Sequence, residues 1–107
     1  MPILAIVVNR TETIETQQNV ARRLHDDGQM PPAGLIFQVT SPADPGYQVI
    51  SVWDSLASLA RFRDEQLNPA LEAEGVPQEH LATTTFEAAN YMAVDPASAQ
   101  RPTAAST

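Results

Sequence analysis

The stretch that decides the fold is LIFQVTSPADPGYQVISVW, which occupies residues 35–53. Its first six residues and its last seven are rich in β-branched and aromatic side chains, which favour extended strands. The residues between them, SPADPG at positions 41–46, are turn formers that end one strand before the next begins. The stretch therefore predicts a hairpin whose antiparallel strands cover residues 35–40 and 47–53.

Two further strands flank the hairpin in the sequence. Residues 3–8, ILAIVV, form an apolar run that is too short for a buried helix and favours a strand. Near the other end, residues 81–94 hold the last strand, which we place at residues 84–94.

Helical periodicity fills the two gaps between these strands. The first helix is predicted to begin with Thr11 as its N-cap and to end at Gly28. The second helix begins with Asp54 or Ser55 as its cap. Within it, Pro69 either kinks the helix or opens a new turn.

The elements follow the order β-α-β-β-α-β, which is typical of the ferredoxin-like α+β fold. In that fold a four-stranded antiparallel sheet carries two helices on one face. The chain of 107 residues has the length of one domain, which we place at residues 1–94. Residues 95–107, rich in Ala, Ser, Thr and Pro, are expected to form a flexible C-terminal tail.

Charge and cysteine content narrow the class of function. Thirteen acids face six bases, all of them Arg, and the formal net charge is −7. This excess of negative charge argues against nucleic acid and membranes as partners. The chain has no Cys, which excludes disulfides, thiolate metal sites and Cys nucleophiles. No apolar run could span a bilayer and no signal peptide is recognisable, so a cytoplasmic location is expected.

Both faces of the predicted sheet are apolar, which predicts a homodimer. Alternation places Leu35, Phe37 and Val39 on one face of their strand, with Ile36 on the other. In residues 47–53, too, each face carries large apolar side chains. Two helices cover only one face, so a second copy packed sheet to sheet is the simplest cover for the other. A small domain with some exposed apolar surface is the alternative.

Three segments carry a resemblance to a known family: GLIFQV at residues 34–39, YQVISVWDS at 47–55 and RFRDEQLNPAL at 61–71. They resemble the dimeric α/β-barrel superfamily, and most closely small actinobacterial proteins of the antibiotic-biosynthesis-monooxygenase type or of no known activity. The resemblance covers about residues 2–94. It implies a homodimer whose two sheets form a barrel, with a pocket between the sheet and the helices of each subunit. The superfamily includes cofactor-free quinone-forming monooxygenases, haem-degrading oxygenases, isomerases and polyketide cyclases.

The haem-degrading branch of the superfamily does not fit this sequence. The resemblance aligns Asn9 with an Asn of that branch, but Phe62 stands at the position of its Trp and Glu72 near that of its His ligand. Neither Phe nor a carboxylate is a usual haem ligand. The two histidines, His25 and His80, lie in charged or polar surroundings and are expected at the surface.

Polar residues inside apolar strands are the candidate site. Gln38 interrupts the strand at 35–40, and Asn90 and Tyr91 lie within the strand placed at 84–94. The amides of Gln38 and Asn90 can stabilise an oxyanion, which suits a catalytic role, and hydrogen-bonded core positions are the alternative. The substrate-binding candidates are Trp53, Phe62, Tyr91 and Asn9.

Two functions follow from these residues, and the sequence leaves open whether the protein is an enzyme. The first is a cofactor-independent monooxygenase, or a related isomerase or cyclase, acting on an aromatic or polyketide-like small molecule. The second is a non-catalytic ligand-binding or scaffold homodimer, supported by the lack of a strong acid–base pair. The first predicts a pocket of roughly 300 Å³ or more, and the second a filled space. No metal cluster or glycine-rich phosphate loop is recognisable, so no cofactor is expected, although a flavin stays open.

Overall fold

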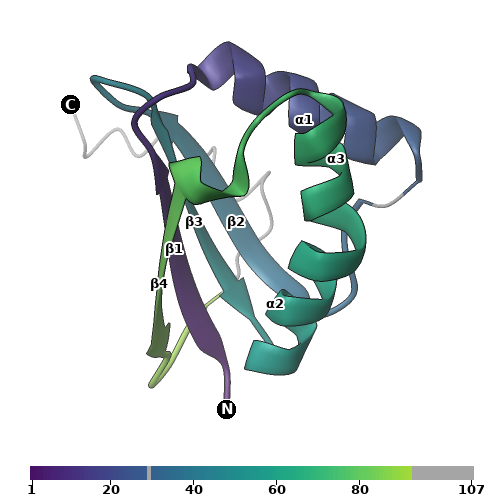
Figure 1. Ribbon diagram of the computed structural model, residues 1–107. Helices are drawn as coiled ribbons and strands as arrows, with labels where there is room; N and C mark the ends of the chain where they lie inside the picture. Colours follow the sequence, from purple (N-terminus) through teal and green to yellow (C-terminus); the bar gives the residue numbers. More distant parts are fainter. Residues whose placement is uncertain (29, 93–107) are drawn as a thin grey trace, which may run out of the picture.

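Four antiparallel strands form one sheet in the spatial order β2–β3–β1–β4. The computed structural model describes residues 1–28 and 30–92, and in it the predicted hairpin pairs β2 with β3 (Figure 1). β1 lies between β3 and β4, which is the ferredoxin-like arrangement, so the predicted α+β fold is confirmed. The strand bounds are Ile3–Asn9 for β1, Leu35–Pro42 for β2, Tyr47–Trp53 for β3 and Leu81–Glu87 for β4.

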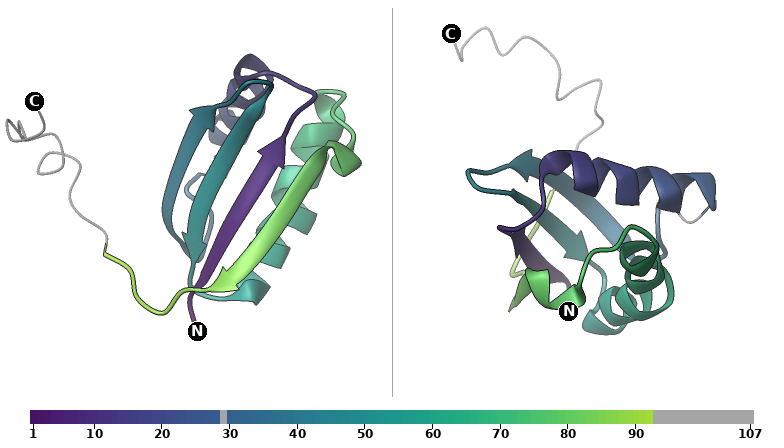
Figure 2. Two further views of the ribbon diagram at one scale, coloured as in Figure 1. Left: turned by 90° about the vertical axis from the view of Figure 1, so that its left-hand side faces the viewer. Right: turned by 45° about the horizontal axis from the view of Figure 1, so that its top comes forward.

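The helices cover one face of this sheet, and no helix among the described residues covers the other (Figure 2). One helix is α1 (Ile14–Asp26), and the second is a rod of three consecutive segments. We call the helix-covered side of the sheet the inner face and the opposite side the outer face. The rod consists of α2 (Leu56–Phe62), η1 (Arg63–Leu67) and α3 (Asn68–Ala73), and the short turn η2 (Gln78–His80) leads from it into β4.

The first helix begins later than predicted. Thr13, not Thr11, is its N-cap residue. The reason is that the Asn9 side-chain oxygen accepts the backbone N–H groups of Thr11 and Glu12, at 2.8 and 3.0 Å. These residues therefore form a turn that must be completed before the helix can start. Of the two residues predicted to cap the second helix, Ser55 is the N-cap, because its hydroxyl accepts the N–H of Ser58 at 3.1 Å.

Pro69 lies inside a continuous rod, at a point where the helical hydrogen bonding changes register. The N–H of Asn68 donates to the carbonyl of Arg63, five residues earlier, which makes η1 a π-helical turn. Pro69 then occupies the first turn of α3, where a missing N–H costs least. A new helical segment does begin at Asn68, but Leu67 and Asn68 both have helical φ and ψ and no side chain caps this segment, so it continues the rod and does not start a separate turn.

The last strand lies earlier than the predicted residues 84–94. It covers Leu81–Glu87, because its partner β1 runs only from Asn9 back to Ile3. One further hydrogen bond joins the N–H of Ala88 to the carbonyl of Pro2, the residue just before β1. Asn90 and Tyr91 therefore follow the strand rather than lying within it. The tail predicted at residues 95–107 lies outside the described residues.

A β-bulge corrects the predicted alternation of β2. Leu35 pairs with Trp53, but the next pair is Phe37 with Val52, which leaves Ile36 as an extra residue. Leu35 consequently packs with Trp53 on the inner face, whereas Phe37 lies on the outer face. The same shift brings Gln38 to the inner face, opposite Ser51.

The core fills the space between the inner face and the helices. One cluster packs α1 against α3 and includes Val20, Leu24 and Leu71. The other packs the start of the rod against the sheet through Ala5, Trp53 and Leu59. No helix within residues 1–28 and 30–92 is long and apolar enough to cross a membrane.

Candidate active site

A cavity of 290 Å³ lies between the inner face and the two helices. Its size falls at the lower end of the range of small-molecule sites, about 300–1,000 Å³. The sheet, α1 and the rod each contribute a wall, so the cavity lies where the resemblance implied a pocket. The apolar lining consists of Val7, Val20, Ala21, Leu24, Met30, Val49, Trp53, Leu59, Phe62, Leu67, Leu71 and Leu81.

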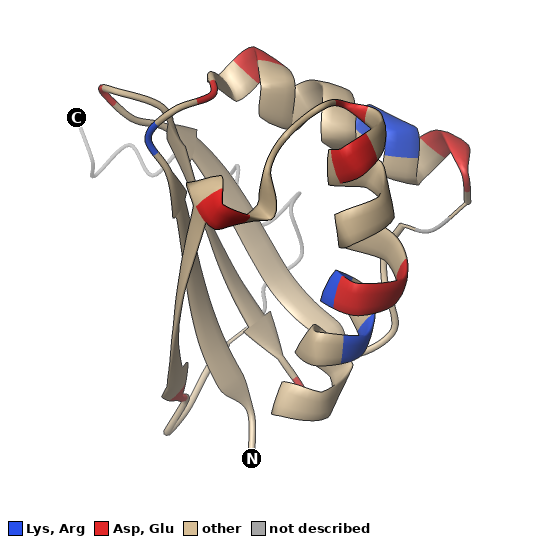
Figure 3. Ribbon diagram, in the orientation of Figure 1, with Lys and Arg blue, Asp and Glu red and all other residues tan. Residues whose placement is uncertain are grey.

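The polar groups that line the cavity are amides and hydroxyls with one cation, Arg63. In the part of the chain that the structure describes, no acidic side chain is among the lining residues. The acids gather instead on the helices and connecting loops, and Glu87 is the one charged residue of the four strands (Figure 3). A neutral or anionic small molecule therefore meets no opposing carboxylate in this cavity. The remaining polar lining residues are Gln17, Gln38, Tyr47, Ser51, Asn68, Gln78 and Thr83.

An aromatic pair forms one end of the cavity. The ring centroids of Trp53 and Phe62 lie 5.3 Å apart and the rings are tilted by 34°. Trp53 is almost fully buried, and its indole N–H donates to the hydroxyl of Ser51 at 2.9 Å. Its polar group is therefore already bonded, and Trp53 offers the cavity a flat apolar surface.

The structure brings three of the six predicted site residues to this cavity. Gln38, Trp53 and Phe62 line it. Asn90 and Tyr91 are exposed beyond the end of β4 and are not among the lining residues. Asn9 is fully buried and is not among the lining residues. The roles given to all six residues stay predictions.

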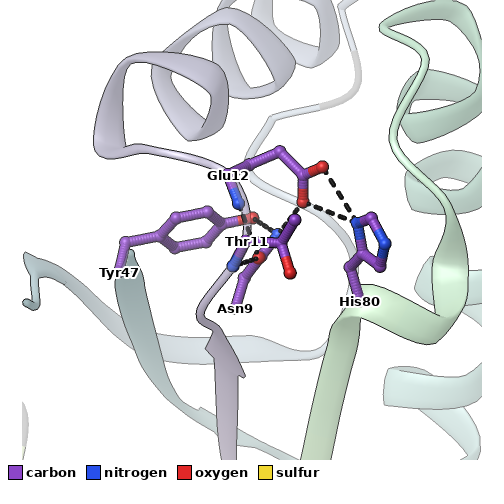
Figure 4. A network of polar contacts seen from close by, with 5 residues as sticks. All are labelled: Asn9, Thr11, Glu12, Tyr47 and His80. Atoms are coloured by element: carbon purple, nitrogen blue, oxygen red, sulfur yellow. Dashed lines mark hydrogen bonds and ion pairs between the residues drawn. The ribbon is translucent and has the colours of Figure 1, made fainter. Parts of the chain in front are cut away.

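Asn9 is the centre of a hydrogen-bond network at the end of β1 (Figure 4). Its side-chain oxygen accepts the N–H groups of Thr11 and Glu12. Its side-chain nitrogen donates to the Glu12 carboxylate at 2.8 Å and to the Tyr47 hydroxyl at 3.3 Å. Both hydrogens and both lone pairs of the amide are thereby used, so Asn9 is held in one orientation.

His80 extends this network from the other side of the loop. Its Nδ1 donates to both carboxylate oxygens of Glu12, at 3.0 and 2.9 Å, which links η2 to the loop after β1. Burial raises the pKa of Glu12, but the hydrogen bonds from Asn9 and His80 outweigh it and hold the pKa below its ordinary value. Glu12 is therefore a carboxylate at neutral pH. His80, expected at the surface, is half-buried.

Tyr47 connects the network to the cavity, because its hydroxyl accepts a hydrogen bond from Asn9 and its side chain also lines the cavity. Burial raises its pKa; the Asn9 hydrogen bond lowers it by less, and the charge of Glu12 adds a still smaller increase. Sequence reasoning missed Tyr47, Glu12 and His80. The one local signal is the Asn9-to-Glu12 spacing after an apolar strand, which is typical of a side-chain turn. The pairing of Asn9 with Tyr47 required the strand register.

Metal ligands are not gathered in the described ranges. No group of three or more His, Cys, Asp or Glu side chains there could hold a metal ion. The expected absence of a cofactor stays a prediction.

The fold is shared with several solved structures. SnoaB, a cofactor-independent oxygenase from Streptomyces nogalater, is 15% identical with a TM-score of 0.56, over 85% of this chain and 95% of its own. A Deinococcus radiodurans protein described as an antibiotic biosynthesis monooxygenase is 18% identical with a TM-score of 0.54. The match covers 89% of this chain and 99% of that protein. A dimeric ferredoxin-like protein of unknown function from Jannaschia is 13% identical with a TM-score of 0.54. The match covers 82% of this chain and 100% of that protein.

These likenesses confirm the resemblance at the level of the fold, because the identities are too low to carry an activity from one chain to another. No protein-family model matches the chain, and no curated protein matches its sequence.

Proposed function

We propose that the chain is a small-molecule enzyme of the cofactor-independent monooxygenase type, acting on an aromatic or polyketide-like substrate. The observation that carries the proposal is the cavity of 290 Å³, with an aromatic end wall and a polar lining of amides, hydroxyls and one Arg. Such a lining can accept a flat ring system and stabilise negative charge on its oxygens. An isomerase or cyclase acting through the same oxyanion would use the same lining.

The chemistry suits a substrate that is itself the reductant. An electron-rich phenolate or enolate donates an electron to O₂, and the two radicals combine to form a carbon–oxygen bond. Loss of water from the protonated peroxide then converts a ring methylene into a carbonyl, so one O₂ yields one quinone oxygen and one water. In this scheme the Gln38 amide N–H and the Arg63 guanidinium stabilise the developing oxyanion.

The alternative is a dimer that binds a ligand without converting it. The observation in its favour is that the described lining contains neither a carboxylate nor an imidazole to remove a proton. The two functions differ in one outcome, because a binding protein retains its ligand unchanged in the presence of O₂.

The test uses 1,8-dihydroxyanthrone, whose methylene is flanked by two rings. The enzyme function predicts uptake of one O₂ for each 1,8-dihydroxyanthraquinone formed, followed by absorbance and an oxygen electrode. Gln38→Leu is expected to lower kcat about 10²-fold. Gln48→Leu is the matched control, because Gln48 lies on the outer face opposite Val8, and it should retain activity. Asn90→Leu tests the second predicted catalytic amide in the same assay.

Binding of the anthrone without faster oxidation than in buffer would favour the non-catalytic function. Equal activity of the Gln38→Leu and Gln48→Leu variants would remove Gln38 from the mechanism.

We also propose that the working unit is a homodimer paired through the outer faces. Phe37, Val39 and Phe86 are about half exposed there, at 48%, 45% and 52%. These residues share the outer face with Leu4, Ile6 and Ile50, and together these six side chains make a broad apolar surface. An apolar surface of this kind on a small chain favours association.

Native mass spectrometry tests the homodimer. The wild-type chain should appear at twice its mass, and Phe37→Asp should convert it to the monomer. Leu56→Asp is the matched control, since Leu56 is 55% exposed at the start of α2, away from the outer face. A wild-type monomer at all concentrations would contradict the homodimer.

A further inference from the structure

The hydrogen positions in the Asn9 network can be assigned from its geometry. The Asn9 oxygen accepts two backbone N–H groups, so it cannot be exchanged with the amide nitrogen without placing donors against donors. The nitrogen therefore faces Glu12 and Tyr47 and donates to both. Glu12 receives a second donor from His80, so the carboxylate side of the network is satisfied.

This assignment determines what the Tyr47 hydroxyl can do. Since Asn9 donates to its oxygen, the hydroxyl hydrogen must point away from Asn9. No hydrogen bond among residues 1–28 and 30–92 has this hydroxyl as its donor. Tyr47 is only 3% exposed, and a buried hydroxyl hydrogen without an acceptor is rare. Tyr47 also lines the cavity, so an acceptor on a bound molecule can satisfy it.

We propose that Tyr47 donates a hydrogen bond to a carbonyl or oxyanion oxygen of the molecule in the cavity, and that Asn9, Glu12 and His80 are positioning residues for that donor. This inference rests on the proposed small-molecule function of the cavity. It adds a selectivity for ligands with an oxygen acceptor at the end of the cavity formed by the start of β3. Gln38 serves a different region, because its partner Ser51 lies four residues further along β3, about 13 Å away.

The chemistry of Tyr47 suits a donor rather than a base. Its raised pKa keeps the phenol protonated at neutral pH. In that form it can donate a hydrogen bond to an oxyanion but cannot act as a base. The fixed Asn9 amide spares the hydroxyl from reorienting when the ligand binds, which is the advantage of preorganised donors. A ligand lacking the oxygen would leave the hydroxyl unbonded and bind more weakly.

The test compares two ligands that differ by one oxygen, 1-tetralone and tetralin, by isothermal titration calorimetry. Tyr47→Phe keeps the ring and removes the hydroxyl. It is expected to weaken 1-tetralone binding about tenfold and to leave tetralin binding unchanged. Gln48→Leu on the outer face should change neither affinity, and circular dichroism confirms that each variant is folded.

The positioning role has its own readout. Asn9→Asp replaces the amide donor with an acceptor, so the Tyr47 hydroxyl should turn towards residue 9 and the preference for 1-tetralone over tetralin should disappear. In the Y47F background the same Asn9→Asp change should have no further effect on that preference. A purely structural role would weaken both ligands equally and in both backgrounds.

The outcomes distinguish failure of the Tyr47 donor from failure of the proposed small-molecule function of the cavity. Binding of both ligands to the wild type with the same affinity ratio in Tyr47→Phe would overturn the Tyr47 donor and leave the cavity function standing. Failure of the wild type to bind either ligand would overturn both.

Discussion

The inner and outer faces of the sheet are built from the same strands, yet the inner face buries polar side chains where the outer face presents mainly apolar ones. The inner face carries Asn9, Tyr47 and Ser51, and all three are buried. The outer face at neighbouring positions carries aliphatic and aromatic side chains such as Val8 and Ile50. On the inner face Asn9 donates to Tyr47 and Ser51 accepts from Trp53, whereas the apolar side chains of the outer face have no hydrogen bonds to satisfy.

The difference shows which face holds specific chemistry. A buried hydroxyl or amide is costly unless its hydrogen bonds are made, so the inner face is organised around particular pairs. An apolar surface needs only shape and area, which suits contact with another apolar surface. The faces should therefore respond differently to the same substitution.

The largest expected effect comes from the aromatic wall of the inner face. Trp53→Ala should lower the free energy of unfolding by about 3–5 kcal/mol, because it leaves a void among Ala5, Leu59 and Phe62. Phe86→Ala on the half-exposed outer face should cost about 1 kcal/mol or less under conditions where the chain is monomeric. Urea denaturation at one fixed protein concentration measures both, since association adds to apparent stability. Equal losses would erase the distinction between the faces.

Gly46 tests the polar end of the inner face. It adopts a φ of +91°, and a Cβ there would overlap the backbone carbonyl of Asn9. Gly46→Ala should therefore cost about 1–3 kcal/mol in backbone strain and displace Asn9 in addition. Gly28→Ala is the matched control, because Gly28 has a φ of +74° and, its chain neighbours aside, no described residue lies within 4 Å of the place that a Cβ would take. Thermal unfolding of the two variants should differ, and equal losses would mean that the Asn9 backbone simply moves aside.

Acid should weaken the Asn9 network before it affects the outer face. The pKa of Glu12 is lowered in the folded state, so the stabilisation is present above its unfolded pKa and is lost as the pH falls through the folded value. The free energy of unfolding should therefore fall below about pH 4.3. Glu12→Gln should cost about 1–2 kcal/mol at pH 7 and show a flatter acid limb. An unchanged pH profile in Glu12→Gln would exclude Glu12 as the source.

The smallest effect should come from one conservative change made on both faces. Val39→Thr places a hydroxyl on the half-exposed outer face and should alter the free energy of unfolding by less than about 0.5 kcal/mol under conditions where the chain is monomeric. Val49→Thr places it in the cavity wall, where a partner is not guaranteed, and should cost about 1–2 kcal/mol. Guanidinium titrations compare the two variants, and the reverse ranking would contradict the assignment of faces.

Much of the fold could be predicted from local signals. The SPADPG turn between two β-rich runs predicted the hairpin, and the candidate caps Asp54 and Ser55 predicted the start of the second helix, which the structure places after Ser55. The predicted element bounds were wrong where contacts with another segment of the chain set the end of a strand or helix. β4 begins and ends where β1 offers backbone partners, so Asn90 and Tyr91 lie outside it. Thr11 does not cap the first helix, because the Asn9 side chain binds the backbone N–H groups of Thr11 and Glu12.

The candidate site was less predictable than the fold. Gln38, Trp53 and Phe62 were chosen as polar or aromatic residues in apolar strands and helices, and they line the cavity. The bulge at Ile36 decides that Gln38 lies on the inner face, and strand alternation alone does not indicate a bulge. Nothing in the local sequence marked Tyr47 or His80 as part of a network, because their hydrogen-bond partners are 38 and 68 residues away along the chain.

The sequence by itself determined the order of elements, the absence of Cys and Lys, and the apolar character of both sheet faces, because these depend on residue type and short-range pattern. Only the tertiary structure decided which face the helices cover, where the cavity lies, and which polar groups meet. Those features depend on strand register, and a shift of one residue moves every side chain of a strand to the opposite face. The Asn9–Tyr47 pair exists because β1 and β3 align at that register.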